Sequence, residues 1–340
     1  TGNTGGIGSG VYSRGPVELV YSTIADNGNG KQVQTLGGDF TSFGSVIAYA
    51  GSSDCLIDGS TTSSYSYDDD GTCGFVDATD VSNGPDPQLA ALADNGGATL
   101  TRFPGVPLVD QIPSAACHPT ETIDQRGAVR PQGEACDIGA VELMRLYVDA
   151  SASGANTGTS WSDAFVELQD ALAVASSGEQ VWIAEGTYLA DFDVGTDLHT
   201  GDTSMSFVIP AGVEVYGGFP AGGGDGTFDA RDPSSYATVL SGDLSDDDVG
   251  HTNTADNTLI VVIVNDDVVV DGIVVERGFT AGVDGTADGV VYRNVSISDN
   301  HDVGMETSGS FTMHDSVLAR NENTGAGGAM YVHGEVTLVR

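Results

Sequence analysis

The sequence predicts an all-β chain, a right-handed parallel β-helix of three-strand coils of about 20–24 residues with a helical N-terminal cap. Glycine is frequent, at 48 of 340 residues, whereas proline is rare, at 11, and no collagen period is present. Short Val- and Ile-rich segments alternate with Gly, Asn and Asp turns, as expected for stacked strands. Matching strands end at Asn300 and Asn321, and another ends at Asn27, which indicates a repeating coil.

Residues 1–75 and 221–340 are predicted to form the coils of this β-helix. In the second stretch, strands are expected at 258–264, 268–275 and 290–297, and helical periodicity is absent. Asparagines stacked at one turn can hydrogen-bond from coil to coil, and left-handed turn conformations suit them. The expected role of these asparagines is therefore structural.

Residues 144–220 are predicted to form the N-terminal cap and the first coils. A strand is expected at 145–149 and an amphipathic helix at 162–176, which Gly178 ends. The apolar face of this helix is shared by Phe165, Leu168, Ala171, Leu172 and Ala175. Such a helix covers the open end of a β-helix, whose strand edges would otherwise pair with other chains.

Residues 76–143 are predicted to form the C-terminal cap region, because repeat character stops there and a cysteine-closed loop follows. The four cysteines fall into two local pairs, Cys55 with Cys73 and Cys117 with Cys136. Since no zinc-binding spacing is present, this even count indicates disulfides and an extracellular or cell-surface location. Each bridge would close a loop of about 20 residues and stabilise the fold by roughly 3 kcal/mol.

The charge balance limits the partners. There are 49 acidic and only 11 basic residues, a formal net charge of −38. Such a field disfavours nucleic acid and anionic membrane surfaces. The longest apolar runs, such as 259–264, are too short to span a bilayer, so no membrane span is expected. The chain opens on Thr1 without a leader segment, which we interpret as a mature or excised piece.

Two sets of motifs stand out. The first set is Tyr147-Val148-Asp149-Ala150-Ser151, Tyr216-Gly217-Gly218-Phe219 and Gly327-Gly328-Ala329-Met330, and the second is Asp124-Gln125-Arg126-Gly127 and Cys136-Asp137-Ile138-Gly139-Ala140-Val141-Glu142. They resemble motifs of bacterial right-handed parallel β-helix surface proteins with repeats like those of polymorphic outer-membrane proteins. The first set is similar to that family's N-terminal cap and coils, and the second to its C-terminal region, which precedes an anchor. Here the C-terminal region comes before the N-terminal cap, so the resemblance holds in permuted order.

The two ends of the chain share one repeat. Asn-Thr-Gly occurs at Asn3 and again at Asn323, and similar strand patterns follow each. A circular permutant, a slice through tandem domains, or a subunit that completes its β-helix with a neighbour would each explain this. The third explanation predicts a head-to-tail fibre or other homo-oligomer, because unpaired strand edges attract further strands. Its assembly residues are Asn3, Val11, Val17, Leu19, Asn323, Met330, Val336 and Leu338.

Acidic clusters suggest calcium as the one cofactor, because hard cations take several oxygen ligands. The densest clusters are Asp243 with Asp246, Asp247 and Asp248, and the run 68–70. Neither has the spacing of a known calcium loop, and solvated turns explain both as well.

The leading functional hypothesis is a non-catalytic extracellular scaffold, a surface fibre or adhesin-like protein that binds a glycan or another surface ligand. The alternative is a polysaccharide-active, lyase-like enzyme. Its base and cation would come from an Arg/Asp face that combines Arg277 and Arg293 with Asp271 and Asp299. No catalytic motif was found for it.

Overall fold

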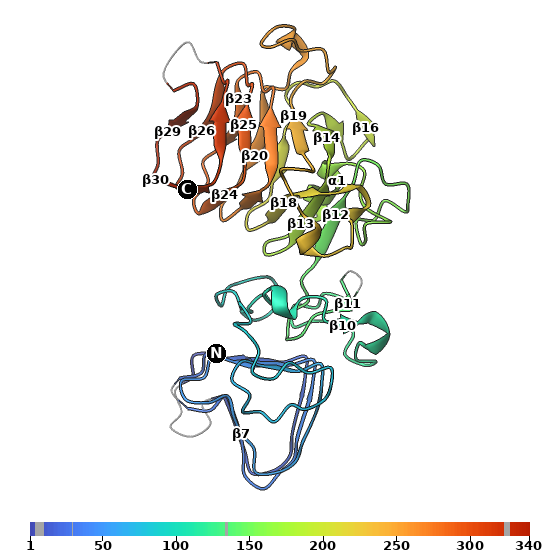
Figure 1. The fold of residues 1–340 in the computed structure, drawn as a ribbon, viewed down its shortest axis with the longest axis vertical. Helices are drawn as coiled ribbons and strands as arrows, with labels where there is room; N and C mark the ends of the chain where they lie inside the picture. The colour runs from blue at the N-terminus through green and yellow to red at the C-terminus, as the bar shows by residue number, and fades with distance from the viewer. Residues whose placement is uncertain (4–9, 29, 133–134, 323–326) are drawn as a thin grey trace. The chain divides into compact units, whose positions relative to one another are not determined.

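The computed structural model describes residues 1–3, 10–28, 30–132, 135–322 and 327–340. These divide into two compact units, Thr1–Met144 and Arg145–Arg340 (Figure 1). Both consist mainly of short strands in parallel sheets, and α1 (Leu168–Val174) is the one α-helix in the described ranges. The expectation of an all-β parallel architecture is therefore confirmed.

The first unit contains three parallel sheets of three strands each. Its chain visits the sheets in a fixed order, one strand in each, and then returns to the first, so three coils stack on one another. Register partners such as Val17 and Phe40, or Phe40 and Thr61, lie 23 and 21 positions apart. The sheets are β1 (Val11–Ser13), β4 (Val33–Thr35) and β7 (Cys55–Leu56); β2 (Val17–Val20), β5 (Phe40–Phe43) and β8 (Thr61–Ser64); and β3 (Thr23–Ala25), β6 (Val46–Ala48) and β9 (Tyr67–Asp68).

A later part of the first unit packs against β6 and β9. It contains the short helices η1 (Val106–Leu108) and η2 (Ser114–Ala116) and the antiparallel pair β10 (Ile112–Pro113) and β11 (Ala135–Cys136). The backbone N–H of Ala140 donates to Thr23 Oγ1 of the first coil. One core cluster joins both parts through Tyr21, Val46, Ala48, Tyr67, Leu108, Ile112, Cys136 and Ile138.

The second unit also contains three interleaved parallel sheets. The first has seven strands: β12 (Arg145–Val148), β13 (Gln180–Ala184), β18 (Glu214–Phe219), β21 (Val269–Asp271), β24 (Val290–Arg293), β27 (Phe311–His314) and β30 (Val336–Val339). The second has β14 (Gly186–Leu189), β19 (Thr238–Ser241), β22 (Ile273–Glu276), β25 (Ser296–Ser298) and β28 (Val317–Ala319). The third has β17 (Phe207–Ile209), β20 (Ile260–Val264), β23 (Ala281–Gly285), β26 (Val303–Thr307) and β29 (Met330–Val332).

Coil length changes along the second unit. From β21 onward, register partners lie 21 to 25 positions apart, as Val290 with Phe311 and Phe311 with Val336 do. Earlier partners are much further apart, because long insertions leave the sheets between them. One insertion carries the antiparallel pair β15 (Phe192–Asp193) and β16 (Leu198–His199), and others carry η3 (Ala221–Gly223), η4 (Phe228–Ala230) and η5 (Thr254–Asp256).

The apolar runs expected as single strands at 268–275 and 290–297 are each two strands. Gly272 and Asn294 stand between them with φ of 72° and 50°. This left-handed backbone turns the chain from one sheet into the next, and Gly and Asn adopt it most easily. The same corner is left-handed in the first unit, at Tyr21, Gly44 and Tyr65.

The helix is shorter than predicted. Its buried face contains Leu168, Ala171 and Leu172, as expected, but the segment 162–167 is not helical. Phe165 there exchanges backbone hydrogen bonds with the end of β12, donating to the carbonyl of Tyr147 and accepting from the N–H of Asp149. This bridge holds Phe165 extended and delays the helix start to Leu168.

No helix in the described ranges combines the length and the apolar character that a bilayer crossing requires.

Candidate functional site

Among the described strands, those at both ends of each unit's sheets pair on one side only. At one end of each unit another segment bridges to an edge strand, Val81 to Tyr67 of β9 and Phe165 to Val148 of β12. At the other end, which we call the open end, the edge strands have no such bridge within the described residues; these are β1, β2 and β3 in the first unit and β28, β29 and β30 in the second. At the second unit's open end, Leu338 is 64% exposed, whereas its register partner Met313 is 4% exposed. At the first unit's open end, Val17 is half-buried while its partner Phe40 is fully buried. Residues whose register partners are buried in the core are therefore exposed or half-exposed to solvent at the open end of each unit.

The two open ends have the same strand spacing. The strands β29 and β30 begin at 330 and 336, and β1 and β2 begin at 11 and 17. Their burial also alternates alike, because Met330 and Val11 are half-buried whereas Tyr331 and Tyr12, which follow them, are exposed. Val336 lies at the first position of β30, as Val17 does in β2, and Leu19 is half-buried like Val17.

Stacked asparagines occur near both open ends. The backbone N and Nδ2 of Asn300 both donate to Asn321 Oδ1, at 3.1 and 2.8 Å. Asn3 makes the same two bonds to Asn27 Oδ1, at 3.3 and 3.0 Å. Asn323, matched with Asn3 in the sequence, lies outside the described residues. The described asparagine ladder therefore consists of Asn300 and Asn321 in the second unit and of Asn3 and Asn27 in the first.

Glycines stack at the corner that leads into β2 and its equivalents. A Cβ added to Gly38 would lie 2.2 Å from the carbonyl carbon of Gly15 in the preceding coil, and one added to Gly334 would lie 1.9 Å from the oxygen of Gly309. Real side chains never approach so closely, so each of these coils needs glycine there. A Cβ on Gly15 itself would meet nothing within 4 Å, because no described coil precedes it.

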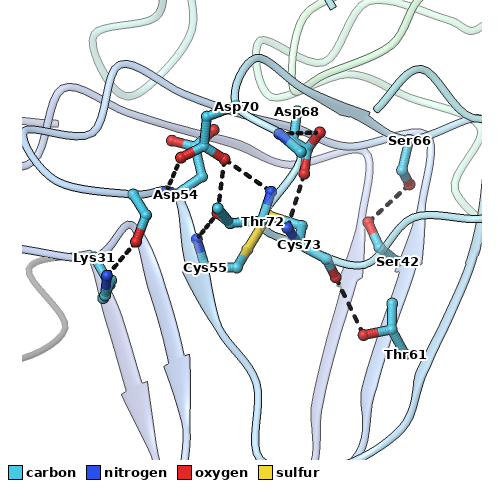
Figure 2. Close-up of a disulfide and its surroundings, with 12 residues drawn as sticks. Lys31, Ser42, Asp54, Cys55, Thr61, Ser66, Asp68, Asp70, Thr72 and Cys73 are labelled. Atoms are coloured by element: carbon cyan, nitrogen blue, oxygen red, sulfur yellow. Dashed lines mark hydrogen bonds between the residues drawn. A yellow bond between two sulfur atoms is a disulfide. The ribbon is translucent and has the colours of Figure 1, made fainter. Parts of the chain in front are cut away.

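The disulfides join Cys55 to Cys73 and Cys117 to Cys136, the two pairs expected from their spacing. Figure 2 shows the first, beside the acidic run 68–70. Asp68 and Asp70 act as turn acceptors there: Asp68 Oδ2 accepts the N–H of Cys73, and Asp70 Oδ2 accepts that of Asp54. These bonds account for the two carboxylates without a metal ion.

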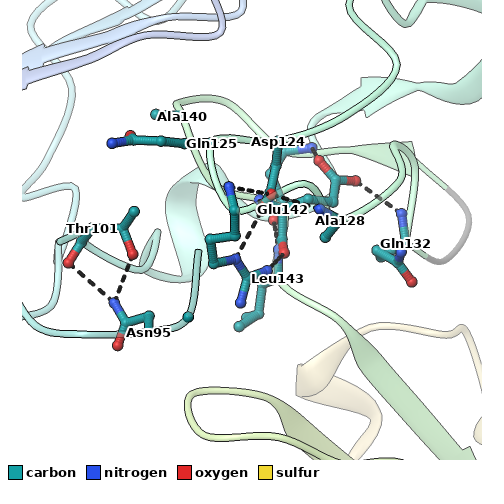
Figure 3. A network of polar contacts seen from close by, with 12 residues as sticks. Asn95, Thr101, Asp124, Gln125, Ala128, Gln132, Ala140, Glu142 and Leu143 are labelled. Atoms are coloured by element: carbon teal, nitrogen blue, oxygen red, sulfur yellow. Dashed lines mark hydrogen bonds and ion pairs between the residues drawn. The ribbon is translucent and has the colours of Figure 1, made fainter. Parts of the chain in front are cut away.

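The motif residues 124–127 and 136–142 assemble into one polar network (Figure 3). Arg130 Nη1 contacts Glu142 Oε2, whose partner oxygen accepts the N–H of Gln132. Asp124 Oδ2 accepts the N–H of Glu142 and the Nε of Arg126. A hollow of about 540 Å³ adjoins the network and is lined partly by Arg130. Because these polar groups bond to one another, the network serves the fold of this unit.

The structure brings together only some of the acidic residues that were expected to cluster with Asp243. The carboxylates that come together are those of Asp243, Asp247 and Asp256, each offering an oxygen within 4.8 Å of the other two. Asp246 is exposed and not part of this group, and Asp248 instead accepts a hydrogen bond from Asn257. The sequence does not identify Asp256 as a member of the cluster, because its spacing from Asp243 matches no known metal-binding loop.

The arginines expected to share one face occupy two different corners. Arg293 ends β24 of the seven-stranded sheet, beside Asp271 in register, whereas Arg277 follows β22 of another sheet. Asp271 and Asp299 also form ion pairs with other arginines. Asp271 pairs with Arg231, and Asp299 pairs with Arg320. The Arg/Asp face required by a lyase-like mechanism is therefore not assembled by these residues.

No family model, curated protein or solved structure matches this chain.

Proposed function

We propose that the chain is an extracellular right-handed parallel β-helix scaffold, with α1 as its N-terminal cap, that assembles head to tail through the open coils of its two units. In such a contact, β29 and β30 of one copy receive β1 and β2 of the next. Parallel pairing would satisfy the unpaired backbone groups of both edges. The contact is heterologous and does not close, so it generates a fibre.

The observation that carries the proposal is Gly15. At this corner, Gly38 and Gly59 must be glycine because of the coil before each of them, yet Gly15 has no such neighbour among the described residues of its own unit. In a contact with another copy, Gly15 would stack on Gly334 in the same way as Gly334 stacks on Gly309. The equal spacing of the two strand pairs supports the same register, in which Leu19 follows Leu338.

Chain reach favours two different copies over one. Ala140 is bonded to the first coil of its unit through Thr23, and β12 begins at Arg145. If β30 paired with β2 of the same chain, β12 would lie seven strand spacings from β2, about 33 Å. The five residue steps from Ala140 to Arg145 cover at most about 18 Å.

Two variants that block opposite ends test the proposal. Gly15→Ala adds a Cβ that would clash with a second copy but with no described residue of its own chain. Leu338→Asp places a charge on β30, at the open end of the second unit. We expect wild-type protein to form linear chains by electron microscopy and sedimentation, and each variant alone to remain monomeric. A mixture of both variants should stop at dimers, since each retains one working end.

Circular dichroism establishes that the variants are folded, and Val76→Ala, at an 87% exposed position in the first unit, is the control that should still form chains. Wild-type monomers at every concentration would refute the proposal, as would chains formed equally by Gly15→Ala.

A further inference from the structure

We propose that the loop between β19 and β20 is a calcium site, with Asp243, Asp247 and Asp256 as its carboxylate ligands. Their oxygens lie within 4.8 Å of one another. Calcium binds oxygen at about 2.3–2.6 Å, so ligands on opposite sides of one ion are about 5 Å apart. This spacing allows a single ion to contact all three. Because all three are carboxylates, the group favours a hard cation over zinc or copper.

Buried oxygens without donors provide a second, independent indication. In the same loop, Asp248 Oδ1, Asp256 Oδ2 and Asn257 Oδ1 accept no hydrogen bond from the described residues. The side chain of Asp248 is 1% exposed and Asn257 is 2% exposed, so water reaches them poorly. Buried polar oxygens in folded proteins are nearly always satisfied, and a bound cation with its waters would satisfy these.

The loop is held in place by bonds that do not need the ion. The backbone N–H groups of Asp247 and Asp248 donate to the two oxygens of Asp243, at 3.2 and 3.0 Å. Asn257 Nδ2 donates to Asp248 Oδ2 and to the carbonyl of Arg277, both at 2.8 Å. These contacts position Asp243, which is 2% exposed, at the base of the cluster and leave Asp247 at its exposed side.

Negative charge exceeds positive charge around the site. Arg277 is the cation paired here, with Nη1 3.8 Å from Asp243 Oδ2 and 3.6 Å from Asp248 Oδ2. It also lies 3.5 Å from Glu276. Among the described residues, Arg277 is the arginine that pairs with Asp243 and Asp248, and a divalent cation would balance the remaining carboxylate charge of the cluster.

Calcium titration of the full chain after chelator treatment tests the site, by calorimetry at constant ionic strength. We expect saturable binding that Asp247→Asn weakens about ten-fold or more, because an exposed charged ligand is lost without a change in shape. Asp246→Asn is the matched control: it is exposed, lies in the same loop and loses the same charge, but it is outside the cluster. Its affinity should stay within about two-fold of wild type.

A second measurement reports on the fold. Both tryptophans, Trp161 and Trp182, lie in the second unit, so their fluorescence follows its unfolding. At one fixed calcium concentration, the rise in that melting temperature should be similar in wild type and Asp246→Asn and clearly smaller in Asp247→Asn. The proposal is overturned if wild type shows no saturable binding, or if the two variants weaken binding equally, which would indicate a diffuse charge effect.

Discussion

Arg130 Nη1 lies 2.5 Å from Glu142 Oε2, and the two side chains are 1% and 0% exposed. The same guanidinium donates to the carbonyls of Asp137 and Gly139 and stacks over the ring of Tyr21 at 4.1 Å. One arginine thus connects the motif residues of the 124–142 region to the first coil of its unit.

Replacing this arginine should destabilise the first unit strongly. Arg130→Met leaves the buried carboxylate of Glu142 without a cation, which costs about 3–5 kcal/mol when a buried pair is broken. Burial raises the pKa of Glu142 and Asp137, and Arg130 opposes this rise at Glu142. Urea unfolding followed by circular dichroism measures the loss.

The double variant Arg130→Met with Glu142→Gln is the control, because it removes both charges. It should recover part of the stability, whereas a loss as large as in the single variant would mean that packing of the guanidinium, rather than its charge, is what matters.

The asparagine ladder should stabilise the second unit. Asn300 is fully buried, donates to Asn321, and accepts the N–H of Gly278 at 2.8 Å. Asn300→Ala leaves these partners unsatisfied, and we expect about 1–3 kcal/mol less stability in urea unfolding followed by tryptophan fluorescence. Val317→Thr, at a 56% exposed position of β28, should change stability by less than about 0.5 kcal/mol. Equal effects of the two changes would contradict a role for the ladder.

The sequence allowed the repeating coils to be predicted, because short apolar strands alternate with turn residues along it. The corners at Gly272 and Asn294 were missed, because each lies inside a continuous apolar run that was predicted as one strand, and a left-handed backbone divides that run into two strands. The insertions of the early coils were harder to predict, because residues that leave the sheets carry no periodic pattern. The helix start was misplaced for a related reason: Phe165 fits a helical face in sequence, but a backbone bridge to β12 decides its conformation.

The candidate sites were predicted less well than the fold. Asp256 joins Asp243 and Asp247 only through the path of a loop, which residue spacing does not reveal. Arg277 and Arg293 were expected to share one face because they lie on neighbouring predicted coils, yet they lie at different corners of the coil. Side-chain proximity between coils depends on register and corner, and a one-residue error in either changes it.

Stability of the first unit should fall as pH rises. Asp54 is fully buried, and neither of its oxygens accepts a hydrogen bond from the described residues. Burial, and then the adjoining carboxyl of Asp69, raise the pKa of Asp54 to about 9. An unfolded aspartate ionises near pH 4, so folding takes up a proton between about pH 4 and 9. This lowers stability by up to about 1.4 kcal/mol per pH unit over that window.

Asp54→Asn should remove this slope and make the first unit more stable than wild type at pH 8. Amide hydrogen exchange in the presence of a chelator measures it, since peptides from 1–144 are resolved from the rest. Asp58→Asn, at a nearby exposed position, should retain the wild-type slope. Identical pH profiles for wild type and Asp54→Asn would show that Asp54 does not hold the proton.

Reduction of the disulfides should destabilise the first unit and leave the second unchanged. Both bridges, Cys55–Cys73 and Cys117–Cys136, lie within Thr1–Met144 and span 18 and 19 positions. Loop closure of this size contributes about 3 kcal/mol per bridge. Under reducing conditions the circular dichroism transition of the first unit should therefore move to lower urea, while the tryptophan fluorescence transition of the second stays in place. A shift of both transitions together would mean that the two units unfold as one cooperative body.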